Sequence, residues 1–165
     1  MAHLNESFDF NSIATPDVRK AFRGSPSKEF LGAQTKLYKW TEHPLIGPKG
    51  ITSWWSLVAS FTLKNGTAVP GLQTLQERGS RLGVHERDYS RVRSAVTEQW
   101  NSMRNPLFIE LIQPVWAWIG QASGQLANSN EPNVLLIGGS YQVWLPNLTA
   151  QYVKQFSALP HLQAR

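Results

Sequence analysis

Two apolar stretches, LFIELIQPVWAWIGQ (107–121) and NVLLIGGSYQVWLPN (133–147), decide the fold of this chain. Both are rich in β-branched and aromatic residues and are interrupted by Gly or Pro, which is typical of strands in a packed sheet. Charge almost disappears in this part of the chain, where only Glu131, Lys154 and Arg165 are ionised after residue 113. The last third of the sequence therefore predicts the sheet of a globular domain.

Helix signals come first along the chain. Thr15-Pro16-Asp17 combines a capping hydroxyl, a proline suited to the first turn and an acidic residue near the positive helix end, so it predicts a helix to about Phe22. Ser25-Pro26 predicts a second short helix that ends near Ala33. We expect residues 1–36 to form an arm with short helices.

The remaining residues, 37–165, are expected to form one domain. KLYKW (36–40) alternates with a period of two and predicts a strand, whereas ITSWWSLVASFTL (51–63) fits either a strand or a helix. LQTLQERGSRLG (72–83) predicts a short helix. The strongest helical pattern is ERDYSRVRSAVTEQW (86–100), because its apolar residues recur at three- and four-residue spacing.

Strands are expected at about 107–112, 115–119, 134–137 and 142–145, and a last short helix is expected from Thr149 to Phe156. Helices precede strands in this order, and they do not alternate with them. That order indicates an α+β fold. Asn65-Gly66 and Pro70-Gly71 predict tight turns between the middle elements.

Composition limits the class of protein. At 165 residues with 41% hydrophobic residues, the chain has room for one core and is not a disordered sequence. No apolar run approaches the roughly 18 residues of a membrane span, and MAHLNESFDF lacks the pattern of a secretory signal. The absence of cysteine excludes disulfides and thiolate zinc sites. We expect a cytoplasmic protein, or one secreted by a route without a cleaved signal peptide.

The net charge of +5 is concentrated in arginines near the middle of the chain. Guanidinium groups favour planar, two-pronged contacts with phosphate or carboxylate. One interpretation is a solvated helix face. The other is a patch for nucleic acid, a nucleotide phosphate or an acidic partner, with Arg87, Arg91 and Arg93 making the phosphate contacts. The full cluster is Arg78, Arg81, Arg87, Arg91, Arg93 and Arg104.

The residue patterns that several reaction types require are absent from the sequence. The four histidines show no metal-ligand spacing, and no GxSxG, GxxxxGK[ST] or GxGxxG motif is present. Glu110 and Glu131 are the carboxylates of the predicted sheet region, which does not favour a two-carboxylate hydrolase. Most of the seven tryptophans suit a core. In the Trp54-Trp55 pair, however, a strand turns one indole away from the core, where it can stack on a nicotinamide or a base.

The order of these segments resembles the ADP-ribosyltransferase fold, as in toxins of the arginine-serine-glutamate type. In that family one strand carries a basic residue for the cofactor pyrophosphate, the next a Ser-Thr-Ser-like motif, and a late strand a Glu/Gln-x-Glu loop with the catalytic glutamate. Leu37-Tyr38-Lys39-Trp40 looks like the first strand, Ile51–Ser56 looks like a loose second motif, and Ser140-Tyr141-Gln142 stands at the loop position. The resemblance implies N-terminal helices followed by a small, mainly antiparallel split β-sheet sandwich.

The resemblance also implies the site and its cofactor, NAD. Lys39 would hold the pyrophosphate, Thr52 and Ser53 would buttress the site, and Trp54 or its neighbour would stack on nicotinamide. Gln142 would contact the nicotinamide ribose from the cleft. We also assign Tyr141 to the cofactor-binding residues, although alternation along the strand turns its side chain away from that ribose.

The sequence departs from the family pattern at the position of the catalytic glutamate, where it has Gln142. A glutamine accepts the same hydrogen bond as the family's glutamate but supplies no negative charge. The catalytic candidates are therefore Gln142 and, as the alternative carboxylate, Glu110.

Three functions from different classes remain open on sequence grounds. The first is an NAD-dependent ADP-ribosyltransferase or NAD glycohydrolase, a toxin or secreted effector that modifies a protein or nucleic acid and has a cognate inhibitor protein. The second is a non-enzymatic nucleic-acid-binding module that uses the Arg-rich helix and exposed tryptophans. The third is an assembly domain whose tryptophans fill a protein interface.

Overall fold

The computed structural model describes residues 2–41, 52–84, 105–126, 135–136 and 138–156. The strands are β1 (Ser27–Leu31), β2 (Lys36–Thr41), β3 (Trp54–Leu57), β4 (Phe61–Thr62), β5 (Ala68–Val69), β6 (Asn105–Leu111), β7 (Val115–Gln121), β8 (Gln125–Leu126), β9 (Leu135–Leu136), β10 (Tyr141–Trp144) and β11 (Val153–Phe156). The helices are α1 (Phe10–Ile13), α2 (Pro16–Ala21), α3 (Leu72–Arg81) and the 3-10 helix η1 (Ala150–Tyr152).

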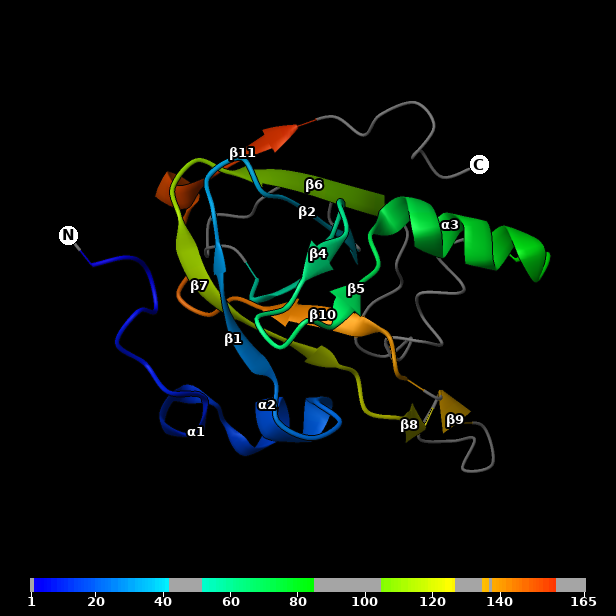
Figure 1. Ribbon diagram of the computed structural model, residues 1–165, viewed down its shortest axis with the longest axis horizontal. Helices are drawn as coiled ribbons and strands as arrows, with labels where there is room; N and C mark the ends of the chain where they lie inside the picture. Colours follow the sequence, from blue (N-terminus) through cyan, green and yellow to red (C-terminus); the bar gives the residue numbers. More distant parts are fainter. Residues whose placement is uncertain (1, 42–51, 85–104, 127–134, 137, 157–165) are drawn as a thin grey trace.

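Seven strands form one antiparallel sheet in the order β1-β7-β10-β3-β2-β6-β11. Two short ribbons, β4-β5 and β8-β9, accompany it. Figure 1 shows α1 and α2 beside the β1–β7 side of the sheet, and α3 extending away from the body beyond β5. The arrangement is an α+β fold, as the sequence predicted.

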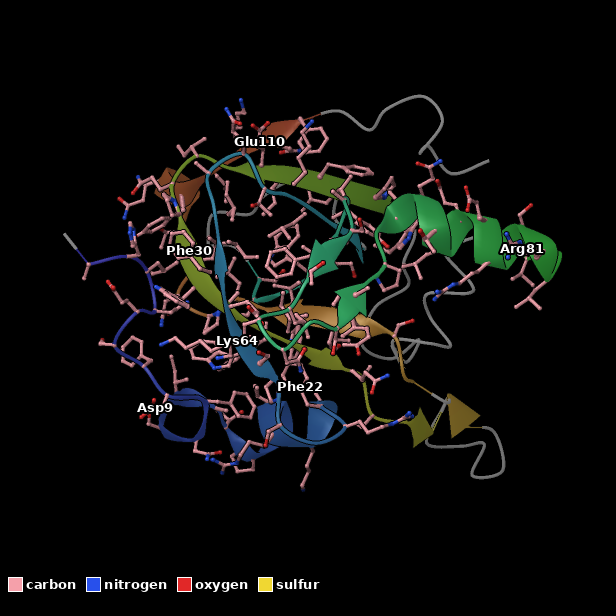
Figure 2. The ribbon with its side chains drawn as sticks, viewed as in Figure 1. Asp9, Phe22, Phe30, Lys64, Arg81 and Glu110 are labelled. Atoms are coloured by element: carbon pink, nitrogen blue, oxygen red, sulfur yellow. The ribbon has the colours of Figure 1, made fainter. Side chains whose placement is uncertain are left out.

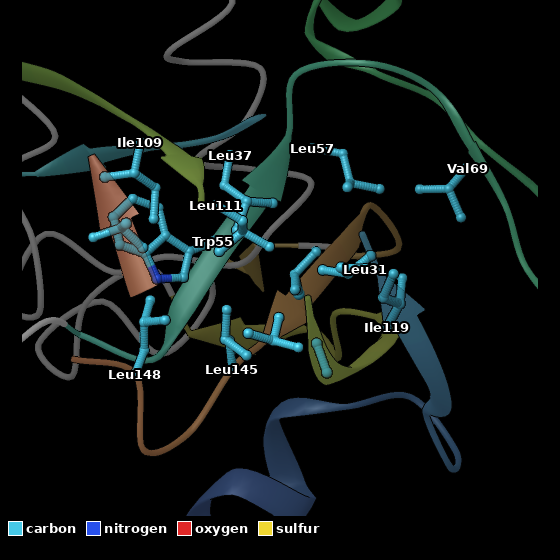
Figure 3. Close-up of a cluster of buried hydrophobic side chains, with 14 of the residues drawn as sticks. Leu31, Leu37, Trp55, Leu57, Val69, Ile109, Leu111, Ile119, Leu145 and Leu148 are labelled. Atoms are coloured by element: carbon cyan, nitrogen blue, oxygen red, sulfur yellow. The ribbon is translucent and has the colours of Figure 1, made fainter. Parts of the chain in front are cut away.

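Two groups of strands, β2 and β6 in one half of the sheet and β1, β7 and β10 in the other, contribute to one core. We call the face of the sheet that carries this core the inner face and the opposite face the outer face. β6 runs into β7 through a sharp corner at residues 112–114, and the two strands take different directions in Figure 1. The largest buried cluster draws on both groups of strands, with Leu37 and Ile109 from the first and Leu31 and Ile119 from β1 and β7 (Figure 3). Burying this continuous apolar face supplies the main driving force for the fold.

The outer face of the sheet is covered by helices. Trp118 and Trp144, both buried, pack with Phe10 of α1 and with Phe22, which follows α2. On the other half, Leu72 of α3 joins a smaller cluster on the outer face of β2 and β6. The tryptophans of β7 and β10 therefore serve packing, which is the interpretation that composition alone favoured for most of them.

Several local predictions are confirmed. The α2 helix begins where expected, and the Thr15 hydroxyl accepts a hydrogen bond from the Val18 amide over 3.3 Å. The Asn65-Gly66 turn closes the β4-β5 ribbon, where Gly66 has a φ of +88°. Gly71 lies so close to the Val58 carbonyl that a Cβ there would sit 2.4 Å from its oxygen. No turn is assigned at Pro70-Gly71; Gly71 has an extended backbone and is the N-cap of α3, so the second signal marks a close backbone approach at a helix start.

Two helix predictions are wrong. The segment after Ser25-Pro26 is strand β1, because its pairing with β7 buries Leu31 completely and Glu29 almost completely. The expected helix from Thr149 to Phe156 is reduced to the one-turn η1, and β11 pairs with β6 instead. In both places sheet pairing decides the outcome over local start signals.

The order of elements also differs from the expectation. Strands β1 and β2 precede α3, so helices do not all come first. β1 belongs to the same sheet as the later strands, although it lies within residues 1–36. The ambiguous stretch 51–63 contains β3 and β4, and the expected helix 86–100 lies outside the described residues. In the described part of the chain, no helix is long and apolar enough to cross a membrane.

Candidate functional site

The best candidate site centres on Lys39 near the end of β2. Its side chain lies on the inner face of the sheet, since Leu37, two residues earlier, is part of the inner core. The Lys39 ammonium lies 5.5 Å from the centre of the Trp55 ring and donates a hydrogen bond to the Thr52 hydroxyl. We call Lys39, Thr52 and Trp55 the Lys39 cluster.

The ammonium of Lys39 is poorly compensated. Burial lowers its pKa from 10.5 to about 8, because desolvation disfavours the charged form. Among the residues that the structure describes, no carboxylate lies within ion-pair distance of it; the described ion pair joins Lys154 and Glu110. A half-buried cation without an anionic partner is a candidate for ligand binding or chemistry.

The segment that carries Thr52 is held by hydrogen bonds to its backbone carbonyls. The Trp55 indole N–H donates to the Thr52 carbonyl over 2.8 Å, and the Leu145 amide donates to the Ser53 carbonyl over 2.7 Å. Trp55 is only 2% exposed, so its ring fixes Lys39 but cannot stack on a ligand. Thr52 is exposed and presents its hydroxyl at the surface of the cluster.

Trp54 lies on the opposite face from the Lys39 cluster. Its ring packs 5.3 Å from Phe22 and 6.3 Å from Trp144, within the cluster covered by α1 and α2. The sequence argument that neighbouring indoles face opposite ways is confirmed. The Trp54 indole, which turns away from the inner core, is nevertheless half-buried by the N-terminal helices. The local sequence did not predict this burial.

Gln142 also lies on the outer face. Val143 is its neighbour on β10 and belongs to the inner core, so the Gln142 side chain points to the other side. The Gln142 amide donates to the carbonyl of Ala21, the last residue of α2, over 2.9 Å. The structure therefore does not bring Gln142 together with Lys39.

Tyr141, in contrast, faces inward. It lines a small, mainly apolar pocket with Ser56, Leu57, Val69, Pro70, Leu75, Ile119 and Val143. The sequence placed Gln142 in a cleft and turned Tyr141 away from it. In the structure Tyr141 points to the inner face and Gln142 to the outer face. Strand alternation determines only that neighbouring side chains point to opposite faces, and it does not determine which face each of them occupies.

Glu110 does not reach the Lys39 cluster either. Lys39 pairs with Leu107 across β2 and β6, and Glu110 is three residues from Leu107, which puts its side chain on the outer face. There it forms an ion pair with Lys154 over 3.5 Å. Its surroundings are those of a cross-strand ion pair on β6 and β11.

A buried carboxylate that the sequence did not single out is Glu29 on β1, only 5% exposed. It accepts hydrogen bonds from the Ser27 hydroxyl and from the backbone amide of Lys64, each over 2.8 Å. The second contact ties the β4-β5 turn to the edge strand β1. Period-two alternation in SKEFL, which places Glu29 on the same face as Leu31, is the signal that could have located it.

No group of three metal-ligating side chains occurs within the described ranges. Arg87, Arg91 and Arg93 lie outside them. Arg78 and Arg81 belong to the last turn of α3 and are exposed, and Figure 2 places Arg81 at the far end of this projecting helix.

No family model and no curated protein matches the sequence. A solved structure described as "Structure of Tse6 in complex with Tsi6" contains a similar chain, which is 10% identical. The likeness covers 90% of this chain and 88% of that chain with a TM-score of 0.40, a weak likeness at the level of the fold.

Proposed function

We propose that this chain binds NAD at the Lys39 cluster, as an ADP-ribosyltransferase-like domain of a toxin or secreted effector that modifies a protein or nucleic acid. In this proposal Lys39 contacts the pyrophosphate and Thr52 donates or accepts a hydrogen bond beside it. The protein acts in the cytoplasm or after export without a cleaved signal peptide, and a cognate inhibitor protein binds it.

The observation that carries the proposal is the Lys39 ammonium, which is half-buried, held in place and without a described carboxylate partner. An anionic ligand would compensate the charge that folding leaves uncompensated, and hydrogen bonds to charged groups are the stronger ones. The residue that the family resemblance assigned to the pyrophosphate thus carries a desolvated ammonium without a described carboxylate partner, which supports an anionic ligand there.

The groups that the resemblance assigned to the transfer step lie away from Lys39. Gln142 contacts α2 on the outer face, and Glu110 pairs with Lys154. Neither supplies a group beside Lys39. The proposal for catalysis therefore rests on the family resemblance and requires a carboxylate other than Glu110 to approach the cofactor.

Calorimetric titration with NAD at pH 7 tests the binding proposal. Lys39→Met should raise the Kd by about 10- to 100-fold, since a charge-assisted contact contributes roughly 1.5–3 kcal/mol. Lys36→Met is the matched control: Lys36 lies on the same strand, and its ammonium is 5.5 Å from the Phe156 ring. Absence of NAD binding at millimolar concentration, or equal effects of the two variants, contradicts the proposal.

A binding module for nucleic acid is the second candidate, favoured by the exposed Arg78 and Arg81 on α3. Both arginines belong to the last turn of α3, which projects from the body of the protein with Arg81 near its far end (Figure 2), and the helix is anchored through the buried Leu72 and Leu75. If this function holds, affinity for a short DNA or RNA should fall steeply with salt, and Arg78→Gln with Arg81→Gln should reduce the slope. Salt-independent or absent binding contradicts it.

A further inference from the structure

We propose that Asn65 is a modification site, at which the Gly66 backbone nitrogen attacks the Asn65 side chain and the side-chain amide is lost by deamidation. The reaction needs only the chain and water, so it does not depend on NAD binding and goes beyond the proposed function. The Asn65-Gly66 turn at the end of the β4-β5 ribbon has no role in either proposed function.

The turn presents the reacting groups to solvent, since Asn65 and Gly66 are both exposed. The Asn65 side-chain oxygen accepts a hydrogen bond from the Thr67 amide over 2.9 Å, which polarises the carbonyl carbon that is attacked. The side-chain nitrogen, which is the leaving group, has no hydrogen-bond partner among the described residues. The amide is therefore oriented through its oxygen and open to water at its nitrogen.

The residue after Asn65 gives little steric protection. Gly66 has no side chain, and a Cβ built on it would meet nothing within 4 Å apart from its chain neighbours. Its φ of +88° lies in the left-handed region, which favours glycine. The described side chains therefore do not shield the backbone beside the attacking nitrogen.

Asn147 provides an internal comparison. It is also exposed, and its φ is +63°. Leu148 follows it and is only 4% exposed, so a packed side chain shields the corresponding backbone nitrogen. The Asn147 side-chain nitrogen also donates to the Asn5 side-chain oxygen over 3.0 Å. We therefore expect Asn147 to keep its amide under conditions in which Asn65 loses it.

Attack requires the tip of the ribbon to open. The Gly66 amide donates to the Leu63 carbonyl over 2.8 Å, and this hydrogen bond must break before the nitrogen can reach the side chain. β4 and β5 have two residues each, and such short two-stranded ribbons are marginally stable on their own. Leu63 and Val69 are buried and anchor the base of the ribbon, so the opening is confined to the exposed tip.

The reaction is an acyl transfer followed by hydrolysis, with no redox change. The Gly66 nitrogen loses its proton to solvent and forms a bond to the Asn65 side-chain carbonyl carbon. The bond from that carbon to the side-chain nitrogen breaks, and this nitrogen takes up a proton and leaves as ammonia. The resulting succinimide takes up one water, which opens the ring to aspartate or isoaspartate. One asparagine and one water thus give one acidic residue and one ammonia.

Incubation of the natural protein at neutral and mildly alkaline pH, followed by peptide mass spectrometry with isoaspartate detection, tests the inference. We expect isoaspartate at position 65, formed several-fold faster than any acidic product at Asn147. The rate should rise with pH, because the attacking nitrogen must lose its proton. An absence of isoaspartate at position 65, a rate that does not depend on pH, or equal rates at the two asparagines overturns the inference.

Two matched variants assign the reaction. Asn65→Gln keeps an amide and the following glycine but requires a larger, less favourable ring, so it should remove the fast deamidation. Asn147→Gln should leave the rate at Asn65 unchanged. Fast deamidation at position 65 in Asn65→Gln, or its loss in Asn147→Gln, would also overturn the inference. NAD titration reports on Lys39, so failure of NAD binding does not imply failure of this reaction.

Discussion

Polar side chains on the inner and outer faces of the same sheet differ in their interaction partners. Lys39 on the inner face has a lowered pKa and no described anionic partner, whereas Gln142 on the outer face completes a hydrogen bond to the carbonyl that ends α2. Val143 pairs with Trp55, whose ring contacts the Lys39 ammonium, and Gln142 is the residue before Val143 on β10. A step of one residue along β10 therefore separates the face with a cation that lacks a described anionic partner, which suits a ligand, from the face with a hydrogen-bonded amide, which suits packing.

The largest expected effect tests whether the outer face is scaffold. Trp144→Ala should lower the free energy of unfolding by about 3–5 kcal/mol, because Trp144 is buried against Phe10, Trp54 and Trp118. Urea denaturation measures the change. A loss below about 1 kcal/mol would mean that this face is not packed as described, and the contrast between the two faces would fail.

The next effect concerns Gln142. Gln142→Glu should destabilise the fold by about 1–3 kcal/mol, because a carboxylate cannot donate to the Ala21 carbonyl and places two oxygens in contact. Gln142→Ala removes the donor without adding charge and should cost less. Thermal unfolding compares the two variants.

The same variant separates the structural role of Gln142 from the role that the family resemblance assigns. With Gln142 on the outer face, Gln142→Glu should not raise NAD hydrolysis. A gain of hydrolysis without loss of stability would place Gln142 at the cofactor and reverse the comparison between the faces.

Lys39 should make stability depend on pH. Its folded pKa of about 8 lies below the unfolded value of 10.5, so the unfolded chain binds more protons between these values and stability rises with pH across that window. Relative to Lys39→Met, the natural protein should gain on the order of 2 kcal/mol from pH 7 to pH 10.5, after discounting for the solvent that reaches a half-buried amine. Parallel pH profiles of the two proteins would remove the desolvation argument.

The smallest effect is expected at the ion pair on the outer face. Lys154→Met should change the free energy of unfolding by less than about 1 kcal/mol, because the Lys154 side chain is 60% exposed and such pairs contribute little. Denaturation at low and high salt should agree. A larger, salt-dependent loss of unfolding free energy would mean that Glu110 contributes more to stability than an exposed cross-strand ion pair does.

The sequence by itself determined the fold class and several of the local elements. Apolar runs with Gly and Pro interruptions located β6, β7 and β10, and the capping hydroxyl of Thr15 located α2. The family resemblance also assigned Lys39 and Thr52 to one site, and the structure places these two side chains in contact. The predictions of β6, β7, β10 and α2 succeeded because they depend on interactions within a few residues of the chain.

Only the tertiary structure decided which face each strand residue occupies. Alternation in a strand says that Tyr141 and Gln142 point opposite ways, but the packed face depends on which strands pair and which helices cover them. The same reason explains β1, where pairing with β7 overrides a local helix signal, and Glu29, whose donor comes from Lys64, 35 residues away. Long-range pairing sets burial, and burial sets the electrostatics of Lys39, so the site emerges only once the sheet is assembled.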